Sequence, residues 1–261
     1  MNGAVSETVL VTGASSGIGR ELAKCFAADG SRLVLTSRNG DALQSLAEEL
    51  RRIHHTEVTV ITADLSLADA PKSIFTELQG RGITVDVLVN NAGFGAGGRF
   101  AELPLQRQLE MLQVNIDAVT SLTGLFLPGM VQRRRGGILN VASVAGFLPG
   151  PGMAVYYATK AFVLSFTEGL AEELRGTNVT ATALCPGPTT TNFGEVAHAH
   201  KTRMVRMARM SAEAVARHGL SSFRKRKTVA VPGLQNRLIV LLVRCNPRSL
   251  VRRLARKFNR L

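Results

Sequence analysis

Short apolar runs alternate along the chain with longer stretches in which apolar residues recur every three or four positions. The short runs are rich in Val, Ile, Leu and Thr, which is typical of strands buried on both faces of a sheet. Alternation of such strands with helices indicates a parallel sheet covered by helices on both sides. The pattern predicts an α/β fold, a Rossmann-type doubly wound sheet of seven parallel strands at residues 9–12, 32–36, 58–62, 85–90, 137–142, 179–185 and 228–231.

The stretches between these runs predict helices, among them residues 20–28, 41–53 and 105–130. In the second of these helices, four apolar residues fall at helical spacing and are predicted to face the sheet, with no role in chemistry: Leu43, Leu46, Ala47 and Leu50.

Composition favours a single large domain. The chain has 261 residues, of which 45% are hydrophobic and 20% are charged. A chain of this length can bury most of its apolar surface in one core, so residues 1–261 are predicted to form one domain. Its three cysteines, Cys25, Cys185 and Cys245, lie far apart and have neither metal-ligand spacing nor a disulfide framework, so no metal site is predicted. Neither a signal peptide nor a membrane-spanning helix is apparent, and a cytoplasmic location is expected.

A glycine-rich turn follows the first predicted strand directly. It reads Gly13-Ala-Ser-Ser-Gly17-Ile-Gly19 and runs into a helical pattern. Glycines let backbone N–H groups and the positive end of a helix approach a pyrophosphate closely, as a bound dinucleotide requires. The alternative is an ordinary tight turn, and the spacing differs from the general Gly-x-Gly-x-x-Gly fingerprint.

Tyr156 and Lys160 are four residues apart, and Ser143 lies thirteen residues before the tyrosine. In a helix this spacing places the phenol and the ammonium on one face. A fixed positive charge there is expected to lower the tyrosine pKa and prepare the phenol for proton transfer. Taken alone, the pair favours a half-buried tyrosine beside a solvated lysine, and the other motifs reverse that preference.

These motifs together resemble the short-chain dehydrogenase/reductase family over residues 6–192, in a branch with an extended C-terminus. The resemblance rests on several separate segments in the family's order: Thr12 to Gly19, Asp64, Asn90-Asn91-Ala92-Gly93, Asn115, Ser143, Tyr156 and Lys160.

The resemblance implies a catalytic role for four residues. Tyr156 would be the general acid, and the Ser143 hydroxyl would polarise a substrate carbonyl. Lys160 would assist the tyrosine and bind the nicotinamide ribose, and Asn115 would hold a water in a proton relay. Tyr157 competes with Tyr156, but its separations from Ser143 and Lys160 are fourteen and three residues rather than thirteen and four.

The end of the second predicted strand indicates which cofactor is bound. It carries no carboxylate to accept the ribose hydroxyls of NAD. Arg38 instead offers a planar cation for a 2'-phosphate, with Ser37 and Asn39 as further hydrogen-bonding residues, so NADP(H) is preferred over NAD(H). The alternative for Arg38 is a solvated surface charge. The full predicted set of cofactor contacts is Gly13, Ser15, Ser16, Gly17, Ile18, Gly19, Ser37, Arg38, Asp64, Leu65, Asn91, Ala92, Gly93, Asn115, Tyr156, Lys160, Pro186, Gly187, Thr189 and Thr191.

The expected function is NADP(H)-dependent interconversion of a carbonyl and an alcohol on an apolar ketone, aldehyde or acyl substrate. Four apolar residues beside the catalytic segments support that choice, each of them equally compatible with ordinary core: Phe94, Phe147, Leu148 and Met153. Residues 188–210 are expected to form a substrate lid. The alternative function is a non-catalytic NADP-binding protein whose basic amphipathic C-terminus docks on a membrane or a partner.

Positive charge is concentrated at the C-terminus. Residues 201–261 hold 17 Lys or Arg and one acidic residue, a balance of +16, whereas residues 1–200 have a balance of −3. Within a predicted helical extension at 234–261, residues 248–261 form a basic amphipathic helix that can pack on its own domain or a second subunit, or lie on an anionic membrane. The small number of aromatic residues for base stacking argues against nucleic-acid binding. A homodimer is expected, because the extension departs from the tetrameric branch of the family.

Overall fold

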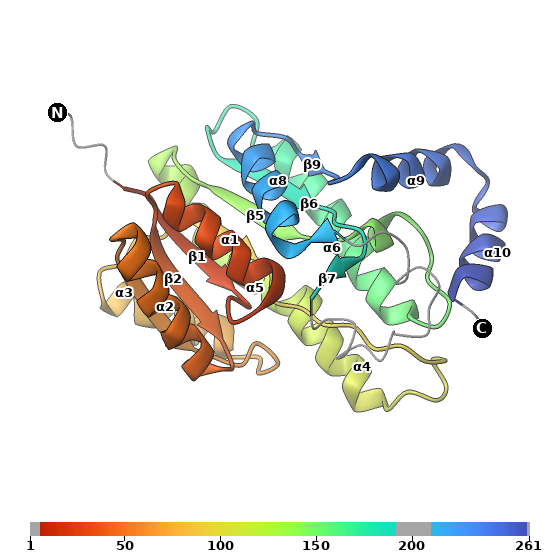
Figure 1. Cartoon of the computed structure of the whole chain (residues 1–261), viewed down its shortest axis with the longest axis horizontal. Helices are drawn as coiled ribbons and strands as arrows, with labels where there is room; N and C mark the ends of the chain where they lie inside the picture. The colour runs from red at the N-terminus through yellow and green to blue at the C-terminus, as the bar shows by residue number, and fades with distance from the viewer. Residues whose placement is uncertain (1–5, 192–209, 260–261) are drawn as a thin grey trace.

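The computed structural model describes residues 6–191 and 210–259, and it contains the predicted seven-stranded parallel sheet (Figure 1). All neighbouring strands in this sheet are parallel. The strands are β1 (Thr8–Thr12), β2 (Arg32–Ser37), β3 (Val58–Thr62), β4 (Val87–Asn90), β5 (Gly137–Val141), β6 (Thr180–Leu184) and β9 (Val229–Ala230).

The strand order in the sheet is β3-β2-β1-β4-β5-β6-β9. From β1 the chain first adds strands on one side of the sheet, β2 and β3, and then continues on the other side with β4. The central strands β1 and β4 pair directly, with Val9 opposite Val87 and Val11 opposite Val89. In an open α/β sheet, ligands bind outside the carboxyl ends of the strands at such a change of side, because the connections leave on opposite faces and open a crevice. The loops after β1 and β4 are therefore the expected binding edge.

Helices cover both faces of the sheet. One layer contains α1 (Gly17–Ala28), α2 (Gly40–His54) and α8 (Ala212–Arg224), on the near side in Figure 1, and the other contains α3 (Ala70–Gly80), α5 (Ala118–Arg133) and α6 (Ala154–Glu173). The four apolar residues predicted to face the sheet from α2 are at most 1% exposed, which confirms that prediction.

The helix predicted over residues 105–130 is interrupted. It consists of α4 (Leu105–Leu112), a π-helical turn at Gln113–Asp117 and then α5. The π turn carries Asn115, whose side chain is 1% exposed. By length and apolar composition, residues Leu105–Arg133 also meet the criteria for a membrane span. Because α5 packs against α3 and β4, we interpret the segment as a core helix.

Residues 188–210, predicted as a lid, are described only at their ends. Thr189–Thr190 (β7) pairs in parallel with Met210–Ser211 (β8), which the sequence did not predict. Residues 192–209 lie outside the described part of the chain, so the lid prediction stays a prediction.

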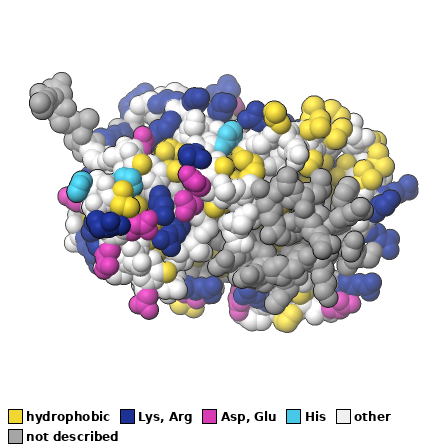
Figure 2. Space-filling view, in the orientation of Figure 1, with side chains coloured by type: hydrophobic (Ala, Val, Ile, Leu, Met, Phe, Trp, Pro, Cys, Tyr) yellow, Lys and Arg dark blue, Asp and Glu magenta, His cyan; other side chains and the backbone are white. Residues whose placement is uncertain are grey.

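The C-terminal extension forms two helices, α9 (Leu234–Cys245) and α10 (Arg248–Asn259). In Figure 1 they follow each other along one edge of the molecule, and in Figure 2 hydrophobic side chains gather at the upper right, over α9. The helix α9 packs against the 3-10 helix η2 (Val144–Phe147). In α10, Val251 is 6% exposed and Leu254 46% exposed, so its apolar residues are only partly covered.

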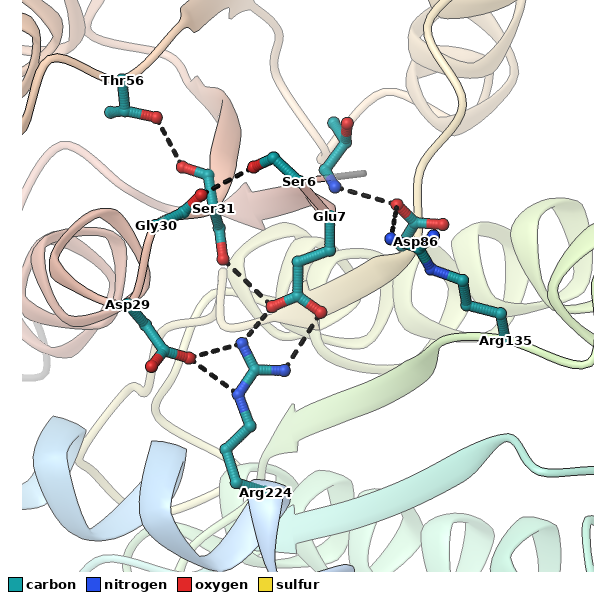
Figure 3. A network of polar contacts seen from close by, with 10 residues as sticks. Ser6, Glu7, Asp29, Gly30, Ser31, Thr56, Asp86, Arg135 and Arg224 are labelled. Carbon is teal, nitrogen blue, oxygen red and sulfur yellow. Dashed lines mark hydrogen bonds and ion pairs between the residues drawn. The ribbon is translucent and has the colours of Figure 1, made fainter. Parts of the chain in front are cut away.

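At the amino end of the central strand β1, one arginine connects distant parts of the chain (Figure 3). The Arg224 guanidinium at the end of α8 donates to Glu7 from two nitrogens and to Asp29 Oδ2 from Nε at 2.8 Å. Ser31 Oγ also donates to Glu7, at 3.0 Å. The start of β1, the end of α1 and the end of α8 are therefore joined by one polar network.

Candidate active site

The predicted catalytic serine and tyrosine meet at the carboxyl end of the sheet. Ser143 follows β5 and begins η2, where its Oγ accepts a hydrogen bond from Ala145 N at 3.1 Å and donates to Pro186 O at 3.3 Å. Tyr156 lies in the first turn of α6, and its phenol shares a hydrogen bond with the Ser143 side chain. Two segments thirteen residues apart are thus brought into direct contact.

Lys160 lies one turn further along α6 and is 6% exposed. Its Nζ donates to Val141 O at 2.8 Å and is 5.9 Å from the centre of the Tyr156 ring. Burial lowers the pKa of Lys160 to about 8. At neutral pH the ammonium form therefore still predominates beside the phenol.

The pKa of Tyr156 differs from the sequence-based expectation. Burial raises the pKa of the phenol above its ordinary value, and the hydrogen bond with Ser143 only partly opposes that effect. The expectation of a lowered pKa was wrong for this arrangement, because the Lys160 ammonium is directed at the Val141 carbonyl. A phenol that keeps its proton at neutral pH can act as a proton donor.

Asn115 connects the π turn to two neighbouring segments. Its Nδ2 donates to Phe94 O and to Thr159 Oγ1, both at 3.0 Å, and its Oδ1 accepts from Phe94 N at 3.1 Å. Thr159 Oγ1 in turn donates to the Tyr156 carbonyl at 2.7 Å. The side chain of Asn115 therefore fixes α6 relative to the loop after β4, and its predicted role in holding a water stays a prediction.

The sequence did not single out Thr159. A threonine inside a helix one residue before the lysine carries no signal of this contact, which depends on the π turn lying alongside α6.

Tyr157 occupies a different environment from Tyr156. It is 4% exposed and packs with Ala145 and Met153, whereas Tyr156 is half-buried. A Cβ added to Gly150 would lie 2.1 Å from the Tyr157 ring, so this ring fills the space beside the glycine. We interpret Tyr157 as a packing residue.

The glycine turn is held tightly against the loop after β4. Asn91 Nδ2 donates to Thr12 O at 2.9 Å and to Gly13 O at 3.2 Å. Gly13 has a φ of 65°, and a Cβ there would lie 2.9 Å from the Cα of Ala92. A Cβ on Gly19 would lie 2.3 Å from Asn91 Nδ2.

Thr12 supports the same corner of the sheet. Its Oγ1 accepts from the backbone N–H groups of Asn91 and Ala92, at 2.9 and 3.0 Å, and donates to Val89 O. These contacts hold the two loops of the switch point together, with the glycine-rich turn leading into the N-terminus of α1. A glycine-rich turn that leads into a helix N-terminus fits the pyrophosphate of a dinucleotide.

Residues 15–18 of the glycine-rich turn are partly or fully exposed. Gly17, with a φ of 56°, lies next to Thr191, whose Cγ2 would be 3.1 Å from an added Cβ. The turn after β1 and the segment after β6 therefore approach each other, as joint binding of one cofactor requires. Ser15 and Ile18 are half-buried, and Ser16 is exposed at the start of α1.

Arg38 and Asp64 follow neighbouring strands, β2 and β3. Burial alone would raise the pKa of the Asp64 carboxyl. Hydrogen bonds from Ser66 N and Oγ, at 2.9 and 2.8 Å, and the positive charge of Arg38 together outweigh this effect, so the net shift of the pKa is downward. Asp64 is therefore ionised at neutral pH, with the exposed Arg38 guanidinium close enough to influence it. Leu65 is buried below them.

Ser37 and Asn39 make local contacts at the start of α2. Asn39 Oδ1 caps the helix by accepting from Ala42 N at 3.0 Å, and Asn39 N donates to Ser37 Oγ at 3.2 Å. The amide Nδ2 of Asn39 is the part of that side chain suited to a phosphate.

The segment after β6 depends on a residue from α9 that the sequence did not indicate. Asn236 is 9% exposed, and its Nδ2 donates to Pro232 O at 2.7 Å. A Cβ on Gly187 would lie 2.2 Å from Asn236 Oδ1. Asn236 thus supports the backbone of Pro186 and Gly187, while Thr189 Oγ1 donates to Gly187 O at 2.9 Å.

Arginine guanidinium groups lie over the rings of two of the four residues predicted to line an apolar pocket. The Arg107 guanidinium lies 4.0 Å from the centre of the Phe94 ring, and that of Arg244 lies 5.2 Å from the Phe147 ring. Leu148 packs on the cluster that contains Met153, which is 8% exposed. The sequence did not predict these arginines, because they come from α4 and α9.

Within residues 6–191 and 210–259, no group of three or more His, Cys, Asp or Glu side chains is placed to hold a metal ion. The three cysteines are free thiols.

Comparison with known proteins identifies the family. The model for short chain dehydrogenases matches residues 7–202. The chain belongs to the short-chain dehydrogenase family. A very-long-chain 3-oxoacyl-CoA reductase of Laccaria bicolor is 39% identical over 175 residues, a match covering 66% of this chain and 51% of that protein. The chain thus spans about half the length of that relative.

Two solved members of the short-chain dehydrogenase family resemble the structure over most of both chains. A short-chain dehydrogenase from Sphingobium yanoikuyae in complex with NADPH is 33% identical, with a TM-score of 0.82 and coverage of 90% of this chain and 91% of that one. A bulky-bulky ketone specific alcohol dehydrogenase from Comamonas testosteroni is 30% identical, with a TM-score of 0.77 and coverage of 93% and 96%. Solved neighbours hold NADPH or NAD, so the family to which this chain belongs uses nicotinamide cofactors.

Proposed function

We propose that the protein uses NADP(H) to interconvert a carbonyl and an alcohol on an apolar substrate. The observation that carries the proposal is the hydrogen bond between Tyr156 and Ser143 at the carboxyl end of the sheet, with Lys160 one turn away on the same helix. A purely binding protein has no physical need for a proton donor arranged in this way.

In the reductive direction, a bound nicotinamide supplies a hydride to the carbonyl carbon of the substrate. Tyr156 donates its proton to the carbonyl oxygen, which becomes the alcohol hydroxyl. The Ser143 hydroxyl stabilises negative charge on that oxygen as it develops. Lys160 would bind the nicotinamide ribose, and a proton from solvent restores the phenol.

The proposed preference for NADP(H) rests on Arg38. Its guanidinium stands at the end of β2, next to the Asp64 carboxyl, where a 2'-phosphate on the adenosine ribose would add a charge-assisted hydrogen bond. No carboxylate occupies residues 36–39 to accept the ribose hydroxyls of NAD.

An apolar substrate is supported by the walls of the site. Phe94 follows β4 near Asn91, and Phe147, Leu148 and Met153 lie in the chain between Ser143 and Tyr156. The names of the two relatives above, a very-long-chain 3-oxoacyl-CoA reductase and a bulky-bulky ketone specific alcohol dehydrogenase, point to substrates of the same character. Homodimer formation, a single domain and a cytoplasmic location stay predictions.

The reaction is tested by following NADPH absorbance with purified protein and a panel of bulky ketones, long-chain aldehydes and 3-oxoacyl thioesters. Turnover is expected with at least one apolar class, and small charged aldehydes are expected to be poor substrates. Tight NADPH binding without turnover across the panel would contradict the proposed activity and favour a non-catalytic NADP-binding protein.

Replacing Arg38 with alanine tests the cofactor preference. Loss of a charge-assisted hydrogen bond costs about 1.5–3 kcal/mol, so the KM for NADPH should rise by about 10- to 100-fold. The KM for NADH should stay nearly constant, because NADH lacks the phosphate. Arg52→Ala, at an exposed arginine further along α2, is the matched control. Equal changes for both cofactors would show that Arg38 does not recognise the phosphate.

A further inference from the structure

The helix α9 presents a row of leucines to solvent. Leu234 is 80% exposed, Leu238 and Leu241 are each 57% exposed, and Leu242 is 53% exposed. Their spacing of four, seven and eight residues from the first places all four on one helical face. The opposite face carries Asn236 and Val240, which are 9% and 8% exposed and hold the helix on the domain.

This face is a contiguous patch rather than a set of scattered side chains. Figure 2 shows the hydrophobic side chains gathered over α9. Single exposed leucines are common on protein surfaces, whereas a contiguous apolar surface indicates an interaction site. The helix α10 extends it with Leu250 and Leu254, which are 42% and 46% exposed.

The charged residues of α9 and α10 are all positive, and one of them, Arg244, pairs with Glu168 of α6 at 3.9 Å. From Leu234 to Asn259 the chain contains no acidic residue. Arg237 and Arg244 are exposed on α9, and five cations are exposed on α10: Arg248, Arg252, Arg253, Arg256 and Lys257. None of these five takes part in an ion pair among residues 6–191 and 210–259.

The exposed leucines and the positive charge together decide which kind of partner the patch fits. A second copy meeting the patch through the same two helices would bring seven cations against seven, with no carboxylate in either extension to offset them. A nucleic acid would satisfy the charges but leave the leucines exposed, and α9 has no aromatic residue for base stacking. An anionic lipid surface satisfies both, because leucines enter the boundary between headgroups and acyl chains while arginines contact the phosphates.

We propose that α9 and α10 together form a docking surface for anionic lipid membranes, with the four leucines of α9 inserted and the cations of α10 contacting headgroups. The protein lies on the membrane and does not span it, because each helix has only 12 residues. This proposal does not depend on the proposed enzymatic reaction.

The docking helix is also in contact with the candidate active site. On its covered side, α9 packs against η2, which begins at Ser143, and Asn236 lies against Gly187.

Co-sedimentation of the full chain with vesicles tests the proposal. We expect binding to vesicles of phosphatidylcholine mixed with phosphatidylglycerol, and at least about tenfold weaker binding to phosphatidylcholine alone, since several cations contribute at the surface. Raising the salt concentration should weaken binding.

Two variants separate the apolar and charged contributions. The first changes Leu234, Leu238, Leu241 and Leu242 to serine, and the second changes Arg252, Arg253, Arg256 and Lys257 to glutamine. Each is expected to lower the partition coefficient at least about tenfold. Because all eight side chains are exposed, thermal unfolding and NADPH binding should stay close to those of the parent.

Matched controls use residues with similar exposure elsewhere. Ile53→Ser with Leu67→Ser removes two apolar side chains that are 50% and 63% exposed, and should leave vesicle binding unchanged. Absence of binding to anionic vesicles, or equal binding by the leucine variant, would overturn the proposal. A change from dimer to monomer in the leucine variant, without vesicle binding by the parent, would assign the face to a second copy instead.

Discussion

Replacing Tyr156 with phenylalanine is expected to lower kcat by about 10²- to 10⁴-fold, the contribution typical of a positioned general acid. The substitution removes one hydroxyl and leaves the ring in place on α6. Its Ser143 partner keeps its contacts with Ala145 N and Pro186 O, so the loop should hold its shape. The dissociation constant for NADPH should change little, and kcat is measured by NADPH consumption with the best substrate of the panel.

Tyr157→Phe is the matched control for that experiment. It removes the same hydroxyl from the adjacent residue, whose ring packs against Gly150 and is 4% exposed. We expect this variant to keep most of the parent activity. If Tyr157→Phe were inactive and Tyr156→Phe active, the assignment of the proton donor would be wrong.

Gly19→Ala is expected to destabilise the protein, although alanine usually stabilises a helix by about 1 kcal/mol relative to glycine. The added Cβ would lie 2.3 Å from Asn91 Nδ2 and 2.4 Å from Gly13 O. The second contact is to backbone in the turn itself and cannot be relieved by a rotamer change. Forced overpacking of this kind costs about 1–3 kcal/mol.

The effect should appear in two measurements. Thermal unfolding should show a lower Tm, and titration should show weaker NADPH binding, because displacement of Asn91 or Gly13 changes the turn that faces the pyrophosphate. Gly80→Ala, at the end of α3, is the control, since nothing lies within 4 Å of its added Cβ. A Gly19→Ala variant as stable as Gly80→Ala would show that the turn adapts without cost.

The strands were predictable from sequence because most are short apolar runs, and the central strands β1, β4 and β5 are buried on both faces. Val9, Leu10 and Val11 have no exposed surface, and the predicted starts and ends of most strands differ from the structure by one or two residues. The interruption of the helix at 105–130 was not predictable in the same way. The π turn is fixed by the buried amide of Asn115, whose partners Phe94 and Thr159 come from other segments.

The residues of the candidate site were predictable from their spacing, but their electrostatics and supports were not. The direction of the Tyr156 pKa shift depends on burial and on where Lys160 Nζ points, and neither can be read from a separation of four residues. The contact between Gly187 and Asn236 depends on how α9 packs. The leucine face of α9 was missed because only the charge of the segment after it suggested a partner.

The network around Arg224 has a consequence for how the chain is completed during synthesis. Glu7 and Asp29 emerge from the ribosome about two hundred residues before the arginine that both of them bind. A nascent chain shorter than 224 residues holds two carboxylates near the start of the sheet without their shared cation, and like charges so placed repel. The carboxylates beside β1 and α1 thus gain their shared cation only when α8 emerges, and the seventh strand, β9, and the helix α9, whose Asn236 lies against Gly187, follow after this point.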